Sequence, residues 1–233
     1  EGRSRALKDL SLTVPKGSVV ALVGLSGCGK STTAALLMRF CDAAAGHIYM
    51  EGKDYHSMKP EELRKHIAMV PQQVNLFSGT IRDNLLLADP DADDETLMEA
   101  VKEAGLLKFV QSLEKGLDSD VGNAGASLSG GQRQKIGIAR ALLSKAEYMI
   151  FDEATSSVDP ESEKEIWETI GHLAHTRTLI IISHRMSSVR SADCIYVLKD
   201  GKVAQQGNHD TLMAQDGLYR ELVVRQQAME VAE

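Results

Sequence analysis

Residues 18–31 read SVVALVGLSGCGKS, and this stretch decides the class of fold. The apolar, β-branched run up to Val23 predicts a strand that is buried on both faces of a parallel sheet. The segment from Thr32 to Phe40 is rich in Ala, Leu and Met, which predicts a helix. Between them, GLSGCGKS at 24–31 matches G-x-x-x-x-G-K-[ST] in the strand–loop–helix context that this motif requires.

The glycine-rich loop predicts a site for phosphate groups. Glycines adopt positive φ easily and allow close backbone approach, so that successive N–H groups can surround anionic oxygens at a helix N-terminus. We expect Lys30 to reach the β- and γ-phosphates of a bound nucleotide and the Ser31 hydroxyl to ligate Mg²⁺. The alternative is a glycine turn followed by an exposed lysine. The residues expected to bind the nucleotide are Gly24, Ser26, Gly27, Cys28, Gly29, Lys30, Ser31 and Thr32.

A second apolar strand ends in two acids. Residues 148–153 read YMIFDE, and the carboxyl edge of a parallel sheet is where ligands bind in such folds. Because successive strand residues point to opposite sides, the two carboxylates should differ in role. We expect Asp152 to hold Mg²⁺ and Glu153 to act as the general base for an attacking water. The alternative is an acidic strand end that caps the next helix.

The pattern of the remaining sequence predicts an α/β core with a helical segment inserted into it. We assign 1–75 and 146–233 to the core and 76–145 to a helical subdomain. Leu97, Val101 and Ala104 form one apolar stripe, which indicates a helix with one buried face. Asp159 followed by Pro160 indicates a helix start. Asp200-Gly201 predicts a hairpin turn, and the tail at 212–231 is helical in pattern.

Composition limits the classes of function. The chain has 233 residues and a formal net charge of −7, which argues against binding nucleic acid through phosphate neutralisation. Its apolar runs are shorter than the ~20 residues that span a bilayer. The three cysteines, Cys28, Cys41 and Cys194, contain no C-x-x-C pair, so we expect neither a disulfide framework nor a zinc site from them. Cys28 is interpreted as a small loop residue, with a reactive thiolate as the alternative.

Four more motifs occur in order after the phosphate loop. They are VPQ at 70–72, LSGGQ at 128–132, DEATSSVD at 152–159 and ISHR at 182–185. Together the five motifs resemble the ATP-binding cassette family over nearly the whole chain, from Leu7 to about Leu222. The resemblance implies a P-loop NTPase core with a mostly parallel sheet, an N-terminally incomplete antiparallel β subdomain and an inserted helical subdomain. LFSGTIRDNL at 76–85 and the tail after Gly207 are similar to the exporter branch.

The resemblance also implies roles for single residues. Two such domains would stack head to tail around two ATP molecules, as a homodimer or heterodimer. Gln72 would contact Mg²⁺ or the attacking water, His184 would bond the γ-phosphate, and Asp159 would cross the dimer interface. The residues that would bind the nucleotide held by the opposite domain are Ser129, Gly130, Gly131 and Gln132.

Two positions depart from the exporter pattern. Residues 121–125 read VGNAG where exporters usually carry VGERG, so we expect the usual charged contacts to a membrane domain to be absent there. No aromatic residue precedes Phe40, so the family's adenine-stacking aromatic would lie before Glu1. Base stacking contributes roughly 1–3 kcal/mol, and we expect a version extended upstream to bind ATP more tightly.

The function expected is therefore ATP hydrolysis that drives an exporter. The partner would be a transmembrane domain in the same or a separate chain, at the cytoplasmic face of the membrane, with this chain soluble by itself. Two alternatives stay open: a soluble cassette ATPase of DNA repair or translation, and a module in which ATP controls dimerisation without hydrolysis.

Overall fold

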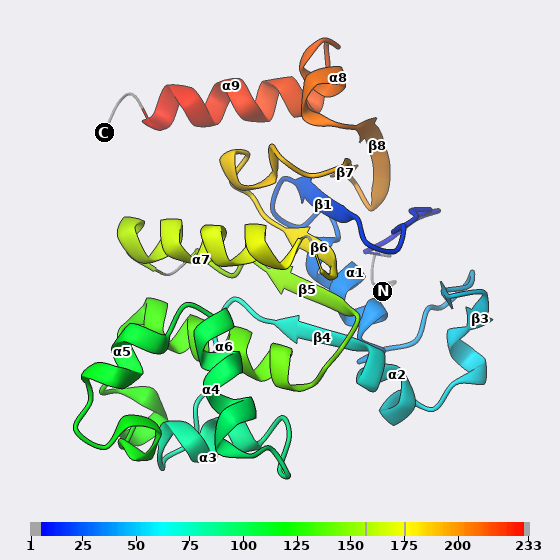
Figure 1. Ribbon diagram of the computed structural model, residues 1–233. Coiled ribbons are helices and arrows are strands. Elements are labelled where there is room, and N and C mark those ends of the chain that lie inside the picture. The colour runs from blue at the N-terminus through cyan, green and yellow to red at the C-terminus, as the bar shows by residue number, and fades with distance from the viewer. Residues whose placement is uncertain (1–5, 157, 175, 231–233) are drawn as a thin grey trace. The chain divides into compact units, whose positions relative to one another are not determined.

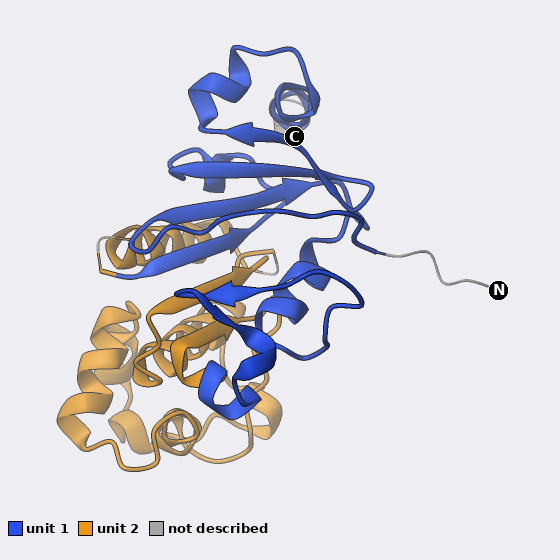
Figure 2. Cartoon of the chain, turned by 90° about the vertical axis from the view of Figure 1, so that its right-hand side faces the viewer, with its two compact units in different colours: residues 1–63, 177–233 blue, residues 64–176 orange. Residues whose placement is uncertain are grey.

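The computed structural model describes residues 6–156, 158–174 and 176–230. The chain forms two compact units, which Figure 2 colours separately. Unit 1 comprises 1–63 and 177–233, and unit 2 comprises 64–176. The chain passes from unit 1 to unit 2 within α2 (Pro60–His66).

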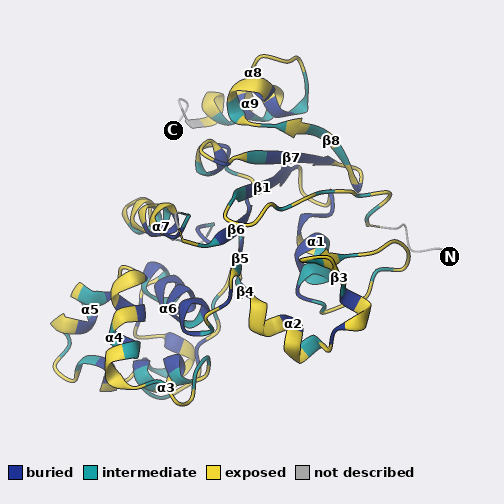
Figure 3. Cartoon of the chain, turned by 45° about the vertical axis from the view of Figure 1, so that its right-hand side comes forward, coloured by how far each residue is buried: buried dark blue, intermediate teal, exposed yellow. Residues whose placement is uncertain are grey.

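The sheet of unit 1 contains three parallel strands and one antiparallel strand. The central strand β1 pairs in parallel with β6 on one side and β7 on the other, and β8 pairs antiparallel with β7. These strands span Val19–Gly24 (β1), Thr178–Ile182 (β6), Cys194–Lys199 (β7) and Lys202–Gly207 (β8). Nearly every residue of the three parallel strands is buried, as expected for continuous apolar runs (Figure 3). The predicted hairpin turn is confirmed, because Asp200 and Gly201 adopt φ of 52° and 80°.

Helices and a small hairpin complete unit 1 (Figure 1). The helix α1 ends before the predicted limit at Phe40, because Arg39 takes a φ of 50° and its guanidinium donates to the Tyr55 carbonyl at 2.8 Å. The prediction of one continuous helix over 212–231 is wrong. Gly217 lies against the side chain of Gln205, and the chain breaks there into α8 and α9; Val231 lies outside the described residues. The elements are α1 (Lys30–Leu37), β2 (Tyr49–Met50), β3 (Lys53–Asp54), α8 (His209–Met213) and α9 (Leu218–Glu230).

Unit 2 combines a pair of parallel strands with helices. β4 (Ile67–Val70) and β5 (Tyr148–Asp152) pair in parallel. The predicted apolar stripe is confirmed, since Leu97, Val101 and Ala104 are fully buried. Figure 3 shows α6 as largely buried. The helices are α3 (Ile81–Leu86), α4 (Asp94–Glu103), α5 (Leu107–Ser112), α6 (Gly130–Leu143) and α7 (Pro160–Leu173).

Both units have the predicted α/β class, with parallel pairing of β1 with β6 and β7 and of β4 with β5, so the fold class is confirmed. Among the residues that the structure describes, no helix has the length and apolar character needed to cross a membrane.

Candidate nucleotide-binding site

The phosphate loop of unit 1 follows β1 directly and has the backbone that the motif predicts. Gly24, Gly27 and Gly29 adopt φ of 148°, 78° and 112°, which non-glycine residues rarely take. A Cβ atom at Gly24 would collide with the carbonyl of Leu198, and one at Gly29 would collide with the side chain of Leu7. Backbone conformation therefore favours glycine at both ends of the loop, and at Gly24 the Leu198 carbonyl also leaves no room for a Cβ atom.

The side chain of Lys30 lies over this loop. Only 7% of Lys30 is exposed, and its ammonium donates hydrogen bonds to the carbonyls of Gly24 at 2.8 Å and Leu25 at 3.2 Å. A buried cation with neutral carbonyl partners suits a ligand anion, because hydrogen bonds between charged groups are stronger than those to neutral ones. Lys30 therefore fits a nucleotide phosphate, and its burial excludes the alternative of an exposed lysine.

The first turn of α1 is left open to a ligand. Its N-cap residue is Gly29, and within the described chain no side chain caps this helix. The first N–H groups of a helix have no partner inside the helix, and the helix dipole places partial positive charge there. Ser31 is exposed in this turn and Thr32 is half-buried, so the Ser31 hydroxyl is accessible to a ligand.

His184 belongs to the same unit and follows β6. The pairing of Leu22 with Ile182 and a bond from the Ser183 N–H to the Leu22 carbonyl at 3.3 Å align the end of β6 with the end of β1. The sheet therefore carries His184, which is exposed, to the edge at which the phosphate loop begins. The Ser183 hydroxyl accepts from the Arg185 N–H at 2.9 Å and so holds the turn after the strand.

One contact to the phosphate loop could not be predicted from the sequence. The β7–β8 turn lies against the loop, and the Gly201 N–H donates to the Cys28 carbonyl at 3.2 Å. The Gly201 carbonyl in turn accepts from the Lys8 N–H at 2.8 Å. The Asp-Gly dipeptide signals the turn, but nothing in its local sequence indicates a partner more than 170 residues away. Cys28 itself is a buried free cysteine, in line with its interpretation as a small loop residue.

Unit 2 gathers three predicted site residues at the ends of its two strands. Because Val70 pairs with Phe151, Gln72 and the acids Asp152 and Glu153 follow at the same edge. Glu153 has a φ of 48°, a strained conformation for a non-glycine residue that is often found at functional sites. Gln72 donates through Nε2 to Ser156 Oγ at 3.0 Å. The serine partner was not predicted, since its sequence context carries no signal for this contact.

The predicted signature residues form the N-terminus of α6. Ser129 Oγ accepts from the Gln132 N–H at 3.1 Å, and Gln132 Oε1 accepts from the Ser129 N–H at 2.9 Å. This reciprocal pair is a capping box. A Cβ atom at Gly131 would lie 2.5 Å from Cβ and Oγ of Ser162, so the glycine permits close approach to the start of α7. Gly130 is the first residue of α6.

Asp159 caps α7, as the sequence predicts. Its carboxylate accepts from the Ser162 N–H at 2.9 Å, and this bond holds the pKa of Asp159 below its ordinary value.

In the VGNAG stretch at 121–125, Asn123 Oδ1 accepts a hydrogen bond from Ser78 Oγ at 3.2 Å. The predicted Mg²⁺ ligands are divided by unit: Ser31 belongs to unit 1, and Gln72 and Asp152 belong to unit 2.

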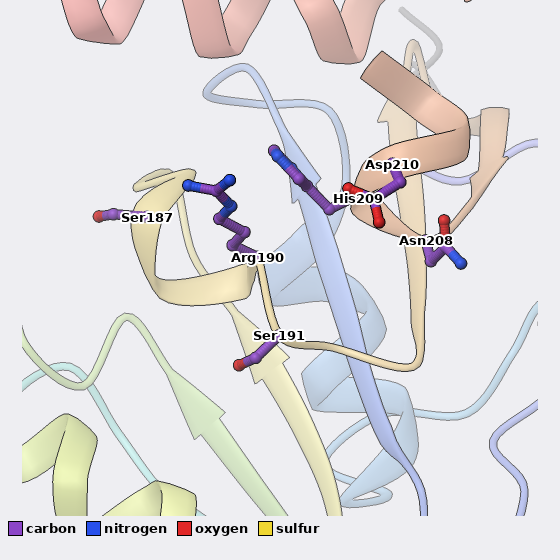
Figure 4. A pocket seen from close by; sticks show the side chains of 6 residues that line it. All are labelled: Ser187, Arg190, Ser191, Asn208, His209 and Asp210. Atoms are coloured by element: carbon purple, nitrogen blue, oxygen red, sulfur yellow. The ribbon is translucent and has the colours of Figure 1, made fainter. Parts of the chain in front are cut away.

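A separate cavity of about 440 Å³ opens in unit 1 between the segment after β6 and the start of α8 (Figure 4). Its walls mix Arg190 with Asp210 and His209, whose Nδ1 lies 2.8 Å from the Tyr219 hydroxyl. None of the predicted nucleotide ligands lines it. The lining residues are Ser187, Arg190, Ser191, Asn208, His209 and Asp210.

A glycine-rich loop between a parallel strand and an uncapped helix, with a buried lysine over it, defines a P-loop nucleotide-binding protein. Comparison with known proteins narrows this class. The sequence profile of the ABC transporter family matches residues 7–156, and the chain belongs to this family. Membership implies an ATP-binding domain with ATPase activity in general, typically with Mg²⁺.

Similar proteins support this assignment to the family. The chain is 43% identical over 217 residues to the ATP-dependent lipid A-core flippase 1 of Colwellia psychrerythraea, with 93% of this chain and 36% of that protein covered. It is 45% identical over 219 residues to the ABC multidrug transporter mdr1 of Aspergillus fumigatus, with 93% and 16% covered. The chain therefore spans about a third or less of these relatives.

A solved structure agrees as well. It is described as a bacterial Atm1-family ABC exporter with ATP bound, and it matches with a TM-score of 0.90 and 41% identity. The match covers 97% of this chain and 40% of that chain.

Proposed function

We propose that this chain is the ATP-hydrolysing domain of an exporter and that it drives transport by a membrane domain. The observation that carries the proposal is the buried Lys30 ammonium over the loop carbonyls, beside an α1 N-terminus without a side-chain cap. The fit to an exporter rests on the relatives, which include a flippase and a multidrug transporter.

Binding of ATP would begin with an exchange of partners at Lys30. Its ammonium would leave the carbonyls of Gly24 and Leu25 for the β- and γ-phosphate oxygens. The open N–H groups of α1 and the loop from Gly24 to Thr32 would receive the remaining phosphate oxygens. This exchange replaces neutral acceptors by charged ones, so it favours the nucleotide-bound loop.

Hydrolysis would use groups from the strand ends. Glu153 would accept a proton from the attacking water, Gln72 would orient that water, and His184 would donate a hydrogen bond to the γ-phosphate. Ser31, Gln72 and Asp152 are the residues that would hold Mg²⁺. The ion, when bound, would neutralise charge on the β- and γ-phosphates.

A second nucleotide-binding domain would complete the reaction. Ser129, Gly131 and Gln132 would contact the γ-phosphate bound by the opposite domain, with Asp159 at the interface between the two. The two nucleotide-binding domains would form either a homodimer or a heterodimer. The membrane domain would place this assembly at the cytoplasmic face of the membrane. The acidic net charge of −7 supports a partner other than nucleic acid.

The substitution Glu153→Gln tests the proposal. We expect ATP binding to persist and hydrolysis to fall by about 10²-fold or more, because general-base catalysis typically contributes 10²–10⁴-fold. Light scattering should detect an ATP-dependent dimer of this variant. Glu114→Gln, an exposed acid elsewhere in unit 2, is the matched control and should hydrolyse ATP at the original rate.

Full turnover by the Glu153→Gln chain would contradict the role of Glu153. ATP-dependent dimerisation of the unsubstituted chain without any hydrolysis would favour instead a module that ATP gates without catalysis. Stimulation of hydrolysis by a membrane domain in vesicles would support coupling to transport.

A further inference from the structure

A cluster of possible metal ligands lies on the β2–β3 hairpin of unit 1, where no role has been assigned. His47 precedes β2, Asp54 ends β3, and His56 lies in the 3-10 turn at Tyr55–Ser57 (Figure 1 labels β3). Tyr49 pairs with Asp54, and the Tyr55 N–H donates to the Ile48 carbonyl at 2.9 Å, which extends the antiparallel register by one residue. This register sets His47 across from His56.

The three side chains converge because strand residues two apart share a face. Nδ1 of His47 lies 2.8 Å from Oδ2 of Asp54, and Nδ1 of His56 lies 3.0 Å from Oδ1 of the same carboxylate. The candidate ligand atoms of all three residues lie within 4.8 Å of one another. Both imidazoles are exposed, so water and ions reach them freely.

The backbone holds this arrangement in place. The His56 N–H donates to Asp54 Oδ1 at 2.8 Å, and Ser57 Oγ donates to the Asp54 carbonyl at 2.6 Å. The ring of Tyr49 stacks on that of His47 with centroids 5.9 Å apart. These contacts restrict the hairpin to a conformation in which the three groups face one another.

Two imidazoles and one carboxylate are ligands that zinc and copper prefer. With metal–ligand distances of about 2.0–2.2 Å, tetrahedral ligand atoms lie roughly 3.3 Å apart. The two nitrogen–oxygen distances of 2.8 and 3.0 Å are close to that separation, so small side-chain rotations would admit an ion in place of the shared protons. Water would supply the remaining ligands of such an exposed ion.

We propose that His47, Asp54 and His56 form a surface site for a divalent transition-metal ion of the zinc and copper type, independent of nucleotide binding. The ion would join the two strands and the turn through their side chains. Arg39, which donates to the Tyr55 carbonyl at 2.8 Å, already attaches this turn to the segment that follows α1. The site therefore belongs to the folded part of unit 1 and needs no second chain.

The experiment measures Zn²⁺ binding by isothermal titration calorimetry on the metal-stripped, nucleotide-free chain. Variants are His47→Ala, His56→Ala and Asp54→Asn, all made together with Cys41→Ser because Cys41 is an exposed thiol that could also bind zinc. The matched control is His172→Ala, which removes an exposed histidine from α7 in unit 2. Circular dichroism and ATP binding verify that each variant folds.

We expect each cluster variant to weaken zinc binding by about tenfold or more, since even outer groups around a metal contribute 10–100-fold. His172→Ala should bind zinc as the unsubstituted chain does. With Cu²⁺ as probe, electron paramagnetic resonance should show nitrogen hyperfine splitting that the double variant His47→Ala, His56→Ala loses.

Equal zinc affinity in the cluster variants and the unsubstituted chain would overturn the proposal. An equal loss in His172→Ala would overturn it too. A copper spectrum without nitrogen splitting would show that the cluster is only a hydrogen-bonded clasp. None of these results depends on hydrolysis, so they leave the proposed ATPase function untouched.

Discussion

Two helix N-termini of this chain resemble each other in sequence and differ in structure. α1 begins at Lys30 within GCGKS, and α6 begins at Gly130 within LSGGQ, so each motif places glycines and a serine around a helix start. At α6, Ser129 and Gln132 cap the helix reciprocally. At α1, the N-cap is Gly29 and the described side chains provide no cap. The α1 donors are therefore left to a ligand, whereas those of α6 are partly satisfied within the chain.

From this difference we expect the two motifs to bind phosphate by different routes. The α1 end can accept an anion without breaking a side-chain bond to the helix, and its lysine is already buried beside it. The α6 end must share or release a capping bond when it contacts a phosphate. We expect unit 1 to dominate ATP affinity and the α6 end to act in ATP-dependent dimerisation.

The largest effect should follow Lys30→Ala. Removing the buried ammonium takes away the cation that we propose binds the phosphates, so we expect ATP hydrolysis to fall by about 10²-fold or more. A coupled-enzyme ATPase assay measures this. The exposed Lys164→Ala on α7 is the matched control, and an equal loss there would contradict a specific role for Lys30.

Glycine substitutions separate packing from helix propensity. Gly131→Ala should destabilise unit 2 by about 1–3 kcal/mol, because its Cβ would overlap Ser162. Gly171→Ala on α7 has open space around the new Cβ and should raise the free energy of unfolding by about 0.5–1 kcal/mol. Urea unfolding measures both changes. If Ser162→Gly fails to rescue the first variant, the packing explanation is wrong.

Loss of the α6 cap should have a smaller effect. Ser129→Ala should lower the free energy of unfolding by about 1 kcal/mol, as removal of a serine cap usually does. Asp93→Ala removes the side-chain cap of α4 and should have a similar effect on unfolding. Only Ser129→Ala should also weaken ATP-dependent dimerisation by light scattering. Equal dimerisation of the two variants would remove the distinction drawn for α6.

The smallest effect is a pH dependence of the capped end of α7. The Ser162 N–H lowers the pKa of Asp159 below its ordinary value of 3.8, so the folded state binds this proton less readily than the unfolded state. The ionised Asp159 cap therefore makes its full contribution to the free energy of unfolding above about pH 3.8. This contribution is lost as the pH falls through the pKa of Asp159 in the folded state. A side-chain NMR titration measures that pKa, and Asp159→Asn should remove the dependence. A value at or above 3.8 would show that the cap does not favour the carboxylate.

The sequence signals of the candidate site are local. The glycines at 24, 27 and 29 and the Asp-Gly hairpin turn follow from backbone conformations that few other residues adopt. Apolar runs such as Thr178–Ile182 predict buried strands, because a strand that is covered on both faces of a parallel sheet carries apolar residues at nearly every position. The tail helix was predicted without its break, because the contact of Gly217 with Gln205 joins segments that have no shared local pattern.

The sequence by itself determined the strand–loop–helix unit, the positions of the two acids and the family, since these depend on residue type and spacing along the chain. Only the tertiary structure decided that the β7–β8 turn donates to the phosphate loop, that Ser156 holds Gln72 and that His47, Asp54 and His56 converge. Such contacts arise from strand register and packing between distant segments, and their energies are not encoded in any short stretch of residues.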